Sequence, residues 1–410
     1  MTTTPLKERK RIVLLDSLRG FALLGIALAN YPEFSLYNFL DSNVQAEMAS
    51  AHVDNLIQGL LLLLVDGKFY TIFSVLFGIG FSIIIRNAQE RGANGMRIFY
   101  RRMLCLAAIG FLHLMLVWSG DILLLYALMG MLLPWFYGKS NRTVLTWAGA
   151  LLILPVLCEM LIVATGYDPS QAAYDAWWYW NGRFGITEEN FATWLRDTDS
   201  YKGISQFLFA ASFERVWEIV SSHRYFKVLG LFLIGMYIGK RGIFAEVSVH
   251  KALLKRVSKV ALCFAFPLSL LYAWSGMNGH LWGDVVHSIL YLISVYPLGI
   301  GYMAMLSLLF IHSSGAKIWP ILAQPGRMSL TTYLSQSFAG ILLFYGVGFG
   351  LGCSLGLWQT LLVAVSVFII LTFISYLWLH SFAYGPFEWI WRIVTHGRYI
   401  NPIRPKKTYQ

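Results

Sequence analysis

Charged side chains are scarce in this chain. Asp, Glu, Lys and Arg make up only 13% of its 410 residues, whereas 57% of the residues are hydrophobic. Because a soluble domain usually carries about 25% charged residues, the composition excludes an ordinary soluble globular protein. Apolar runs of roughly 20 residues recur from end to end, and each is long enough to cross a bilayer as a helix. The sequence therefore predicts an all-α fold, a polytopic transmembrane helical bundle.

Cysteine is rare too, and several functional signatures are missing. None of the four cysteines belongs to a CxxC pair, and all lie in or beside apolar runs, so we predict neither a disulfide framework nor a metal site. The chain has no P-loop and no dinucleotide-binding GxGxxG. ATP-driven transport therefore lacks support.

Ten apolar runs are predicted to span the membrane within a single transmembrane domain, residues 1–410. The approximate runs are 13–31, 68–86, 101–118, 121–138, 143–164, 226–240, 258–275, 285–312, 328–348 and 357–380. The eighth is long enough to tilt or kink at Pro297. A further stretch, 56–65, is too short to span, and we expect it to form a helix lying at the outer surface.

Basic residues gather in the polar connections on one side of this ten-span arrangement. Lys and Arg favour the cytoplasmic side, so both termini are predicted to be cytoplasmic, with residues 393–410 as a basic tail. The same distribution explains the net charge of +11 without a nucleic-acid partner. We expect a multi-pass membrane protein whose main partner is the lipid bilayer, and a homodimer stays open.

The longest outer segment, residues 165–225, is rich in Trp and Tyr with scattered charge. This pattern favours amphipathic helices at the level of the lipid headgroups. An anchor or lid without chemistry is the simpler interpretation. The alternative is that its aromatic rings stack on the sugar rings of an acceptor. In the tail, Glu388 and Arg392 can pair at i, i+4. We interpret this segment as an interfacial anchor, and the alternative is a contribution to a donor site.

Asp16 and Arg19 interrupt the first apolar run. Ionisable residues inside a span are costly and mark functional candidates. Their i, i+3 spacing places them on one helix face, where they can pair. One interpretation is an ion pair that docks the first helix against its neighbours. The alternative is that Arg19 binds a phosphate-bearing ligand from the cytoplasm, with Asp16 orienting it.

His113 lies deep in the third run, and Asp121 opens the fourth after a Ser119–Gly120 turn. This hairpin is expected to bring the two side chains near each other. A neutral histidine oriented by a carboxylate is a competent general base near neutral pH. The structural alternative is a histidine hydrogen-bonded to a neighbouring helix.

Several stretches together resemble the YeiB-like family of bacterial inner-membrane proteins. They are LDSLRGFALLGIALAN (15–30), GKFYTIFSVLFGIGF (67–81), RRMLCLAAIGFLHLMLVWSGDILLLYALMG (101–130), GRMSLTTYLSQS (326–337) and FAYGPFEWIWRIVTHG (382–397). The first stretch also resembles two groups of transmembrane acyltransferases: heparan-alpha-glucosaminide N-acetyltransferase and the enzymes that O-acylate bacterial polysaccharides.

The acyltransferase resemblance implies particular site residues. Asp16, Arg19 and Asn30 fit the first-span pattern of the N-acetyltransferase, and His52 is the positional counterpart of a histidine implicated in its outer loop. The O-acyltransferase motif is an Arg, ten residues and a His, but the count from Arg19 ends on Asn30. The catalytic histidine would then come from elsewhere, and His113 is the candidate.

The resemblance implies acyl-CoA, such as acetyl-CoA, as a cytoplasmic donor, with no metal. A basic rim that includes Arg101, Arg102 and Arg327 is available for its phosphates. We therefore predict transfer of an acyl group to a hydroxyl or amine at the outer face, on a glycan or small molecule. The alternatives are a proton-coupled transporter or exporter of a small solute, in which buried ionisable residues relay protons, and a non-catalytic scaffold.

Overall fold

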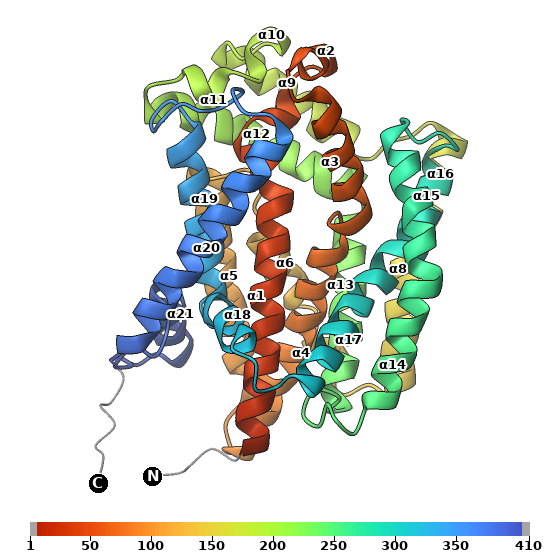
Figure 1. Ribbon diagram of the computed structural model, residues 1–410, viewed down its shortest axis with the longest axis vertical. Helices are drawn as coiled ribbons and strands as arrows, with labels where there is room; N and C mark the ends of the chain where they lie inside the picture. The colour runs from red at the N-terminus through yellow and green to blue at the C-terminus, as the bar shows by residue number, and fades with distance from the viewer. Residues whose placement is uncertain (1–5, 404–410) are drawn as a thin grey trace.

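The computed structural model describes residues 6–403, with side chains described from Val13 onward, and that range is helical. Its one β-type contact is an isolated bridge between Phe382 and Ile403. Residues 404–410 of the predicted basic tail lie outside the described range, and residues 393–396 belong to the last helix rather than to a tail. The helices stand as an upright bundle around α1 (Figure 1).

The first helices of the bundle are α1 (Leu6–Phe34), η1 (Tyr37–Phe39), α2 (Ser42–Glu47), α3 (Ala51–Leu64), α4 (Lys68–Glu90), α5 (Gly95–Leu116), α6 (Leu123–Gly130), α7 (Pro134–Tyr137) and α8 (Asn141–Thr165). An outer group follows: α9 (Gln171–Phe184), α10 (Glu188–Phe191), α11 (Trp194–Asp197) and α12 (Tyr201–Ser221). The chain continues with α13 (Arg224–Lys240), α14 (Lys251–Val260), η2 (Ala261–Ala265), α15 (Phe266–Met277), α16 (Asp284–Leu290), η3 (Tyr291–Val295), α17 (Tyr296–His312), α18 (Ile318–Arg327), α19 (Ser329–Phe344), α20 (Leu357–Ser381) and α21 (Pro386–His396).

Seven helical stretches within residues 6–403 are long and apolar enough to cross a membrane, which makes this a multi-pass membrane protein. They are Val13–Phe34, Ala51–Glu90, Gly95–Leu116, Asn141–Thr165, Lys251–Met277, Asp284–His312 and Leu357–Ser381. Each overlaps one of the predicted runs. The other three predicted runs form shorter helices, so the count of ten spans stays a prediction.

Two short apolar runs differ from their expected form. The run 121–138 divides into α6 and α7 around Pro134, whose ring interrupts the backbone hydrogen bonding of a continuing helix. The stretch 56–65 lies in α3, which stands upright and contacts α15 and α20 instead of lying across the outer face (Figure 1). The apolar side chains of α3 therefore lie along the side of the helical bundle rather than across its outer end.

Two long helices carry wide π turns, η2 and η3, which contact each other. Each π turn comes just before a proline, Pro267 or Pro297. A proline removes one backbone donor and crowds the carbonyl four residues earlier, at Cys263 or Ile293. Both of these residues lie inside the π turns. The wider turn therefore relieves the crowding between the proline ring and the carbonyl group, and the helix does not need a sharp kink.

Glycines allow the central helices to pack at close range. A methyl group added at Gly78 of α4 would overlap the Phe232 carbonyl oxygen of α13, and one at Gly235 would overlap that of Val75. Gly326 of α18 faces the Asp16 carbonyl oxygen of α1 in the same way. Small residues let helix backbones approach, so α1 is fixed closely against α18.

The helices α9 to α12 gather at one end of the bundle, the upper end in Figure 1. Their aromatic rings pack on one another: Trp177 stacks on Trp217 at 6.0 Å between ring centroids. The start of α1, α18 and α21 lie toward the opposite end in Figure 1. We call the first end the outer end and the second the basic end, after the predicted orientation.

Candidate functional site

A cavity of about 1080 Å³ runs along α1. Asp16, Arg19, Ile26, Asn30 and Glu33 line it, and their spacings of three, seven, four and three residues keep them on one face of the helix. With a rise of 1.5 Å per residue, the stripe from Asp16 to Glu33 is about 25 Å long. That length approaches the roughly 30 Å hydrocarbon core of a bilayer, so the cavity penetrates most of the bundle.

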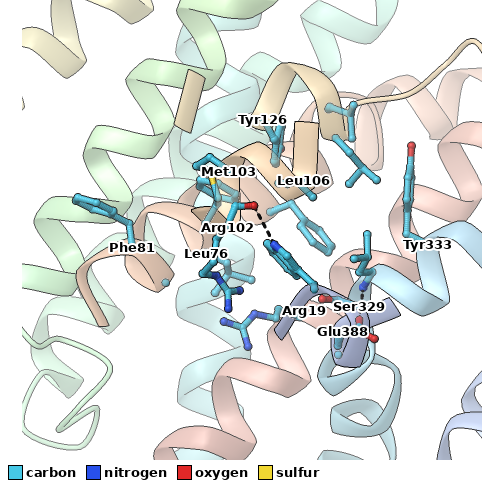
Figure 2. Close-up of a pocket in the computed structure, with 18 of the residues that line it drawn as sticks. Arg19, Leu76, Phe81, Arg102, Met103, Leu106, Tyr126, Ser329, Tyr333 and Glu388 are labelled. Atoms are coloured by element: carbon cyan, nitrogen blue, oxygen red, sulfur yellow. Dashed lines mark hydrogen bonds between the residues drawn. The ribbon is translucent and has the colours of Figure 1, made fainter. Parts of the chain in front are cut away.

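The basic end of the cavity is its mouth. The mouth of the cavity is lined by six arginines of the described residues: Arg19, Arg91, Arg102, Arg327, Arg392 and Arg398. Arg91 and Arg398 are exposed, so solvent reaches the mouth. Figure 2 shows the guanidinium groups of Arg19 and Arg102 extending toward each other below the aromatic side chains. Arg19 also donates to Asp16 at 2.7 Å, which confirms that this pair forms.

Arg102 is held in the mouth by Trp391 of α21. Its guanidinium lies 4.1 Å from the centroid of the Trp391 ring, and the indole donates to the Arg102 backbone oxygen at 2.9 Å. The Arg102 Nε atom is buried and has no hydrogen-bond partner among the described residues. A buried guanidinium donor without a partner is a place for an anionic group from a ligand.

Glu388 fixes α21 against α19. Its carboxylate accepts hydrogen bonds from the Leu330 and Thr331 amides at 2.6 and 3.1 Å and from the Thr331 hydroxyl at 2.6 Å. The expected pair between Glu388 and Arg392 is absent from the described ion pairs, so that prediction was wrong. The amides at the start of α19 attract the carboxylate, and Arg392 instead lies 4.2 Å over the Tyr384 ring.

Burial raises the pKa of Glu388, although its hydrogen bonds with Thr331 and Leu330 oppose this shift. Burial also lowers the pKa of His396 at the mouth, and the nearby charges of Arg392 and Arg102 lower it further. The neutral form of His396 is thereby favoured, and the positive charge of the mouth comes from the arginines.

The middle of the cavity is apolar. It is lined by Phe73, Leu76, Phe77, Phe81, Met103 and Leu106, and Figure 2 labels Leu76, Phe81, Met103 and Leu106. Phe77 stacks on Phe232 of α13 at 4.3 Å between ring centroids. This section suits an uncharged, flexible chain better than a polar solute.

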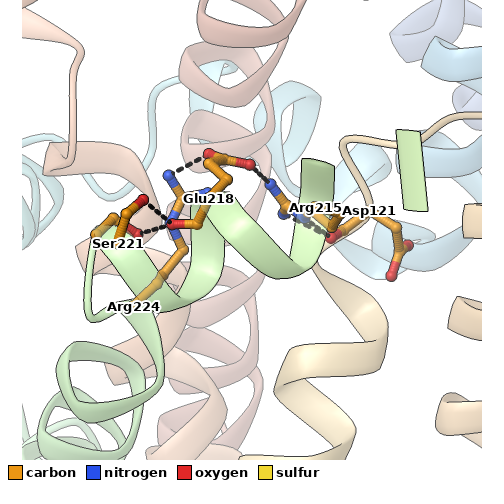
Figure 3. A network of polar contacts seen from close by, with 6 residues as sticks. Asp121, Arg215, Glu218, Ser221 and Arg224 are labelled. Carbon is orange, nitrogen blue, oxygen red and sulfur yellow. Dashed lines mark hydrogen bonds and ion pairs between the residues drawn. The ribbon is translucent and has the colours of Figure 1, made fainter. Parts of the chain in front are cut away.

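The outer end of the cavity is charged. Glu218 of α12 pairs with Arg215 and with Arg224, the latter at 2.6 Å (Figure 3). Arg215 also donates from Nε to the backbone oxygen of Asp121 at 2.8 Å. Burial alone would raise the pKa of Glu218, but the two guanidiniums lower it to about 2. Glu218 is therefore ionised and neutralised by its partners.

Glu33 faces the same end of the cavity from α1. Unlike Glu218, it has no hydrogen-bond or ion-pair partner among the described residues. Its backbone lies in the last turns of α1, one residue after Pro32. The outer end therefore presents one acidic side chain that the fold does not use.

His113 and Asp121 do lie together, as the hairpin predicted. Nδ1 of His113 is 2.8 Å from Oδ2 of Asp121, and Nε2 is 3.1 Å from the Ser337 hydroxyl of α19. The other Asp121 oxygen accepts from the Leu124 amide at 2.8 Å. Both ring nitrogens are thus engaged, and the cluster ties α5, the start of α6 and α19 together.

This histidine cluster is sealed from the cavity. His113 and Ser337 are 2% and 1% exposed, and neither lines the cavity. Trp118 and Tyr333 separate His113 from the cavity. Both residues line the cavity, and their ring centroids are 6.3 and 5.4 Å from that of His113. A substrate in the cavity would meet these two rings before it met His113.

The cavity brings together only some of the predicted residues. Asp16, Arg19, Asn30, Arg102 and Arg327 line it. Arg101 is exposed and is not part of the lining, and His52 is exposed near the start of α3. These two residues therefore lie apart from the cavity, as does the histidine cluster.

Sequence reasoning missed the charged outer end. Glu33, Arg215, Glu218 and Arg224 were not predicted as site residues, although Glu33 could have been found from its spacing to Asn30. The other three come from α12 and α13, and only packing brings them to α1. Among residues 6–403 no three His, Cys, Asp or Glu side chains gather as they would around a metal ion, and all four cysteines are free.

Comparison with known proteins matches part of the chain to a family model. Residues 238–398 match the family described as protein of unknown function (DUF418), and this range contains the mouth residues Arg327, Glu388, Trp391 and Arg392. No solved structure matches the chain.

Similarity to three proteins extends over nearly the whole chain. "Uncharacterized protein YxaH" of Bacillus subtilis (strain 168) is 28% identical over 415 residues, covering 96% of both chains. "Uncharacterized 39.9 kDa protein in amylase 3'region" of Bacillus acidopullulyticus is 29% identical, covering 98% of this chain and 99% of its own. "Uncharacterized protein YeiB" of Escherichia coli (strain K12) is 27% identical, covering 94% and 96%. The resemblance to the YeiB-like family predicted from the motifs is confirmed: part of the chain matches DUF418, and YeiB and YxaH are similar to it over nearly its whole length.

Proposed function

We propose that the protein is a membrane acyltransferase. It would take an acyl group from acyl-CoA at the basic mouth and pass it to a hydroxyl or amine acceptor at the outer end. The observation that carries this proposal is the single cavity that joins six arginines at one end to a charged cluster at the other. An acyl donor needs both an anion site for its phosphates and a path for its thioester.

The mouth supports the donor half of the proposal. Arginine is the side chain best suited to bind phosphate, and Arg102 has a buried Nε donor without a partner. From Arg19, the α1 stripe continues about 21 Å to Glu33. The apolar middle of the cavity would hold the uncharged arm of the donor and the acyl chain, while the phosphates stay at the mouth.

The position of His113 argues against a direct role in the transfer. Its ring nitrogens are engaged by Asp121 and Ser337, and cavity-lining rings separate it from the cavity. We assign His113 and Asp121 to holding the α5–α6 turn and α19. The transfer itself belongs to the outer end of the cavity.

Donor binding tests the proposal. The protein in lipid nanodiscs is titrated with radiolabelled acetyl-CoA, and we expect saturable binding that Arg102→Gln weakens by at least tenfold. Arg101→Gln is the matched control, because Arg101 is the adjacent residue and does not line the cavity. Absence of saturable binding at millimolar acetyl-CoA overturns the proposal, and so does equal weakening by the two variants.

A proton-coupled transporter is the second candidate, favoured by ionisable side chains along a cavity within the membrane. It predicts that proteoliposomes accumulate a solute when a pH gradient is imposed, without any need for acyl-CoA. The acyltransferase predicts release of free CoA and no such accumulation. The two measurements therefore separate the candidates.

A further inference from the structure

The ion pairs at the outer end of the cavity leave one acid without a direct partner. Arg215 and Arg224 both pair with Glu218, and Arg215 also donates to the Asp121 backbone oxygen. The other acid there, Asp66, accepts a hydrogen bond from the Tyr272 hydroxyl at 2.5 Å. Glu33 is left as the carboxyl group that lines the cavity without a hydrogen-bond or ion-pair partner in the described chain.

Aromatic rings surround the approach to this carboxyl group. Trp118 and Tyr333 line the cavity, and Trp118 packs on Phe34, the neighbour of Glu33, at 4.5 Å between ring centroids. Tyr126 lines the cavity as well and is held by Ser74, 2.6 Å from its hydroxyl. A free carboxylate among aromatic faces attracts a compact organic cation, by charge and by cation–π contact.

We infer that Glu33 and the rings of Trp118 and Tyr333 form a binding site for a primary amine. The amine would enter as an ammonium ion and form the missing ion pair with Glu33. Its class follows from the unpaired acid: an ammonium can form the direct ion pair that Glu33 lacks, whereas a neutral hydroxyl would leave the carboxylate unpaired. The binding site stands on its own geometry, and its use in acyl transfer rests on the proposed function.

In that use, Glu33 is the group that takes the proton from the amine. The ammonium transfers one proton to the Glu33 carboxylate, and the freed nitrogen lone pair attacks the thioester carbonyl carbon. The carbon–sulfur bond then breaks, with its electron pair leaving on the sulfur of CoA. The second nitrogen proton is lost as the amide forms. One of the two protons protonates the leaving CoA thiolate, so the products are the amide, free CoA thiol and one proton returned to solution.

Carbodiimide labelling tests the site without needing the natural acceptor. Dicyclohexylcarbodiimide modifies carboxyl groups in apolar surroundings, and mass spectrometry of the peptide locates the adduct. We expect an adduct on Glu33 that 1-aminobutane suppresses at least fivefold, whereas the same concentration of 1-butanol does not. An unlabelled Glu33, or equal protection by the amine and the alcohol, overturns the amine site.

Two variants separate this inference from the proposed function. Glu33→Gln keeps the size of the side chain, so we expect normal acetyl-CoA binding but at least a hundredfold loss of amine-dependent CoA release. Glu214→Gln is the matched control from the neighbouring helix, because Glu214 does not line the cavity. Amine protection of Glu33 in a protein that binds no acetyl-CoA would refute the acyltransferase and retain the amine site. Unchanged CoA release in Glu33→Gln would refute the proton-accepting role.

Discussion

The guanidinium of Arg102 lies 4.1 Å over the ring of Trp391, and the indole of Trp391 donates a hydrogen bond to the backbone of the same arginine. These two contacts join α5 to α21 across 289 residues of sequence. The final helix is therefore part of the cavity wall, whereas the sequence pattern favoured an interfacial anchor over a contribution to the donor site.

Trp391→Ala should weaken acetyl-CoA binding about tenfold, because a stacked guanidinium that loses its ring becomes free to leave the mouth. Nanodisc titration measures the change. Trp389→Ala is the matched control: its indole donates to the Ile400 oxygen and it does not line the cavity. Equal weakening in both variants would mean that α21 acts only as an anchor.

His113→Ala should destabilise the protein by about 3–5 kcal/mol, because the buried Asp121 carboxylate loses its partner. Ser337→Ala should cost only about 1 kcal/mol, since it removes a single neutral hydrogen bond. Thermal unfolding in detergent measures the loss of stability in each variant and shows which loss is larger. A His113→Ala protein that melts normally yet releases no CoA would restore His113 as the reacting base.

Glu214→Gln should flatten the pH dependence of stability. Burial raises the pKa of Glu214 to about 8, with help from the nearby carboxylates of Glu33 and Glu218 and against the effect of Arg215. Between the unfolded value near 4.5 and about 8, the folded state holds the proton more tightly, so stability falls as pH rises across this window. Melting temperatures at pH 5 and pH 8.5 should differ less in the variant than in the parent. An unchanged difference would contradict the raised pKa.

Gly326→Ala should destabilise the protein, because the added methyl group would overlap the Asp16 carbonyl oxygen and push α18 away from α1. Gly149→Ala in α8 is the control, since open space surrounds that position. There we expect a gain of up to about 1 kcal/mol from helix propensity. Melting curves that move in the same direction for both variants would argue against close packing of α1 and α18.

Local spacing allowed the nearest relationships to be predicted. The pair of Asp16 and Arg19 follows from one helix face, and that of His113 and Asp121 follows from a tight hairpin. The apolar runs likewise predicted the long helices, because length and composition decide whether a helix can span a bilayer. These features depend on residues close together in the chain.

The charged outer end could not be predicted in the same way. Glu33 and Glu218 belong to helices far apart in sequence, and Ser337 is 224 residues from His113. Such contacts depend on how the helices pack against one another. The hydrophobic pattern of the sequence does not determine this packing. Arg215 illustrates this: it follows an outer aromatic segment in sequence, but its guanidinium reaches the first residue after the α5 hairpin turn, Asp121.

The depth of the cavity also determines where a membrane voltage would act. When solution from the exposed arginines fills the cavity, the electrical potential of that side extends toward Glu33, and more of the voltage then falls across the layer beyond this residue. A proton that reaches Glu33 through the mouth crosses little of this field. One that crosses from the opposite face would gain or lose about 2.3 kcal/mol per 100 mV, which makes the direction of proton exchange measurable by its voltage dependence.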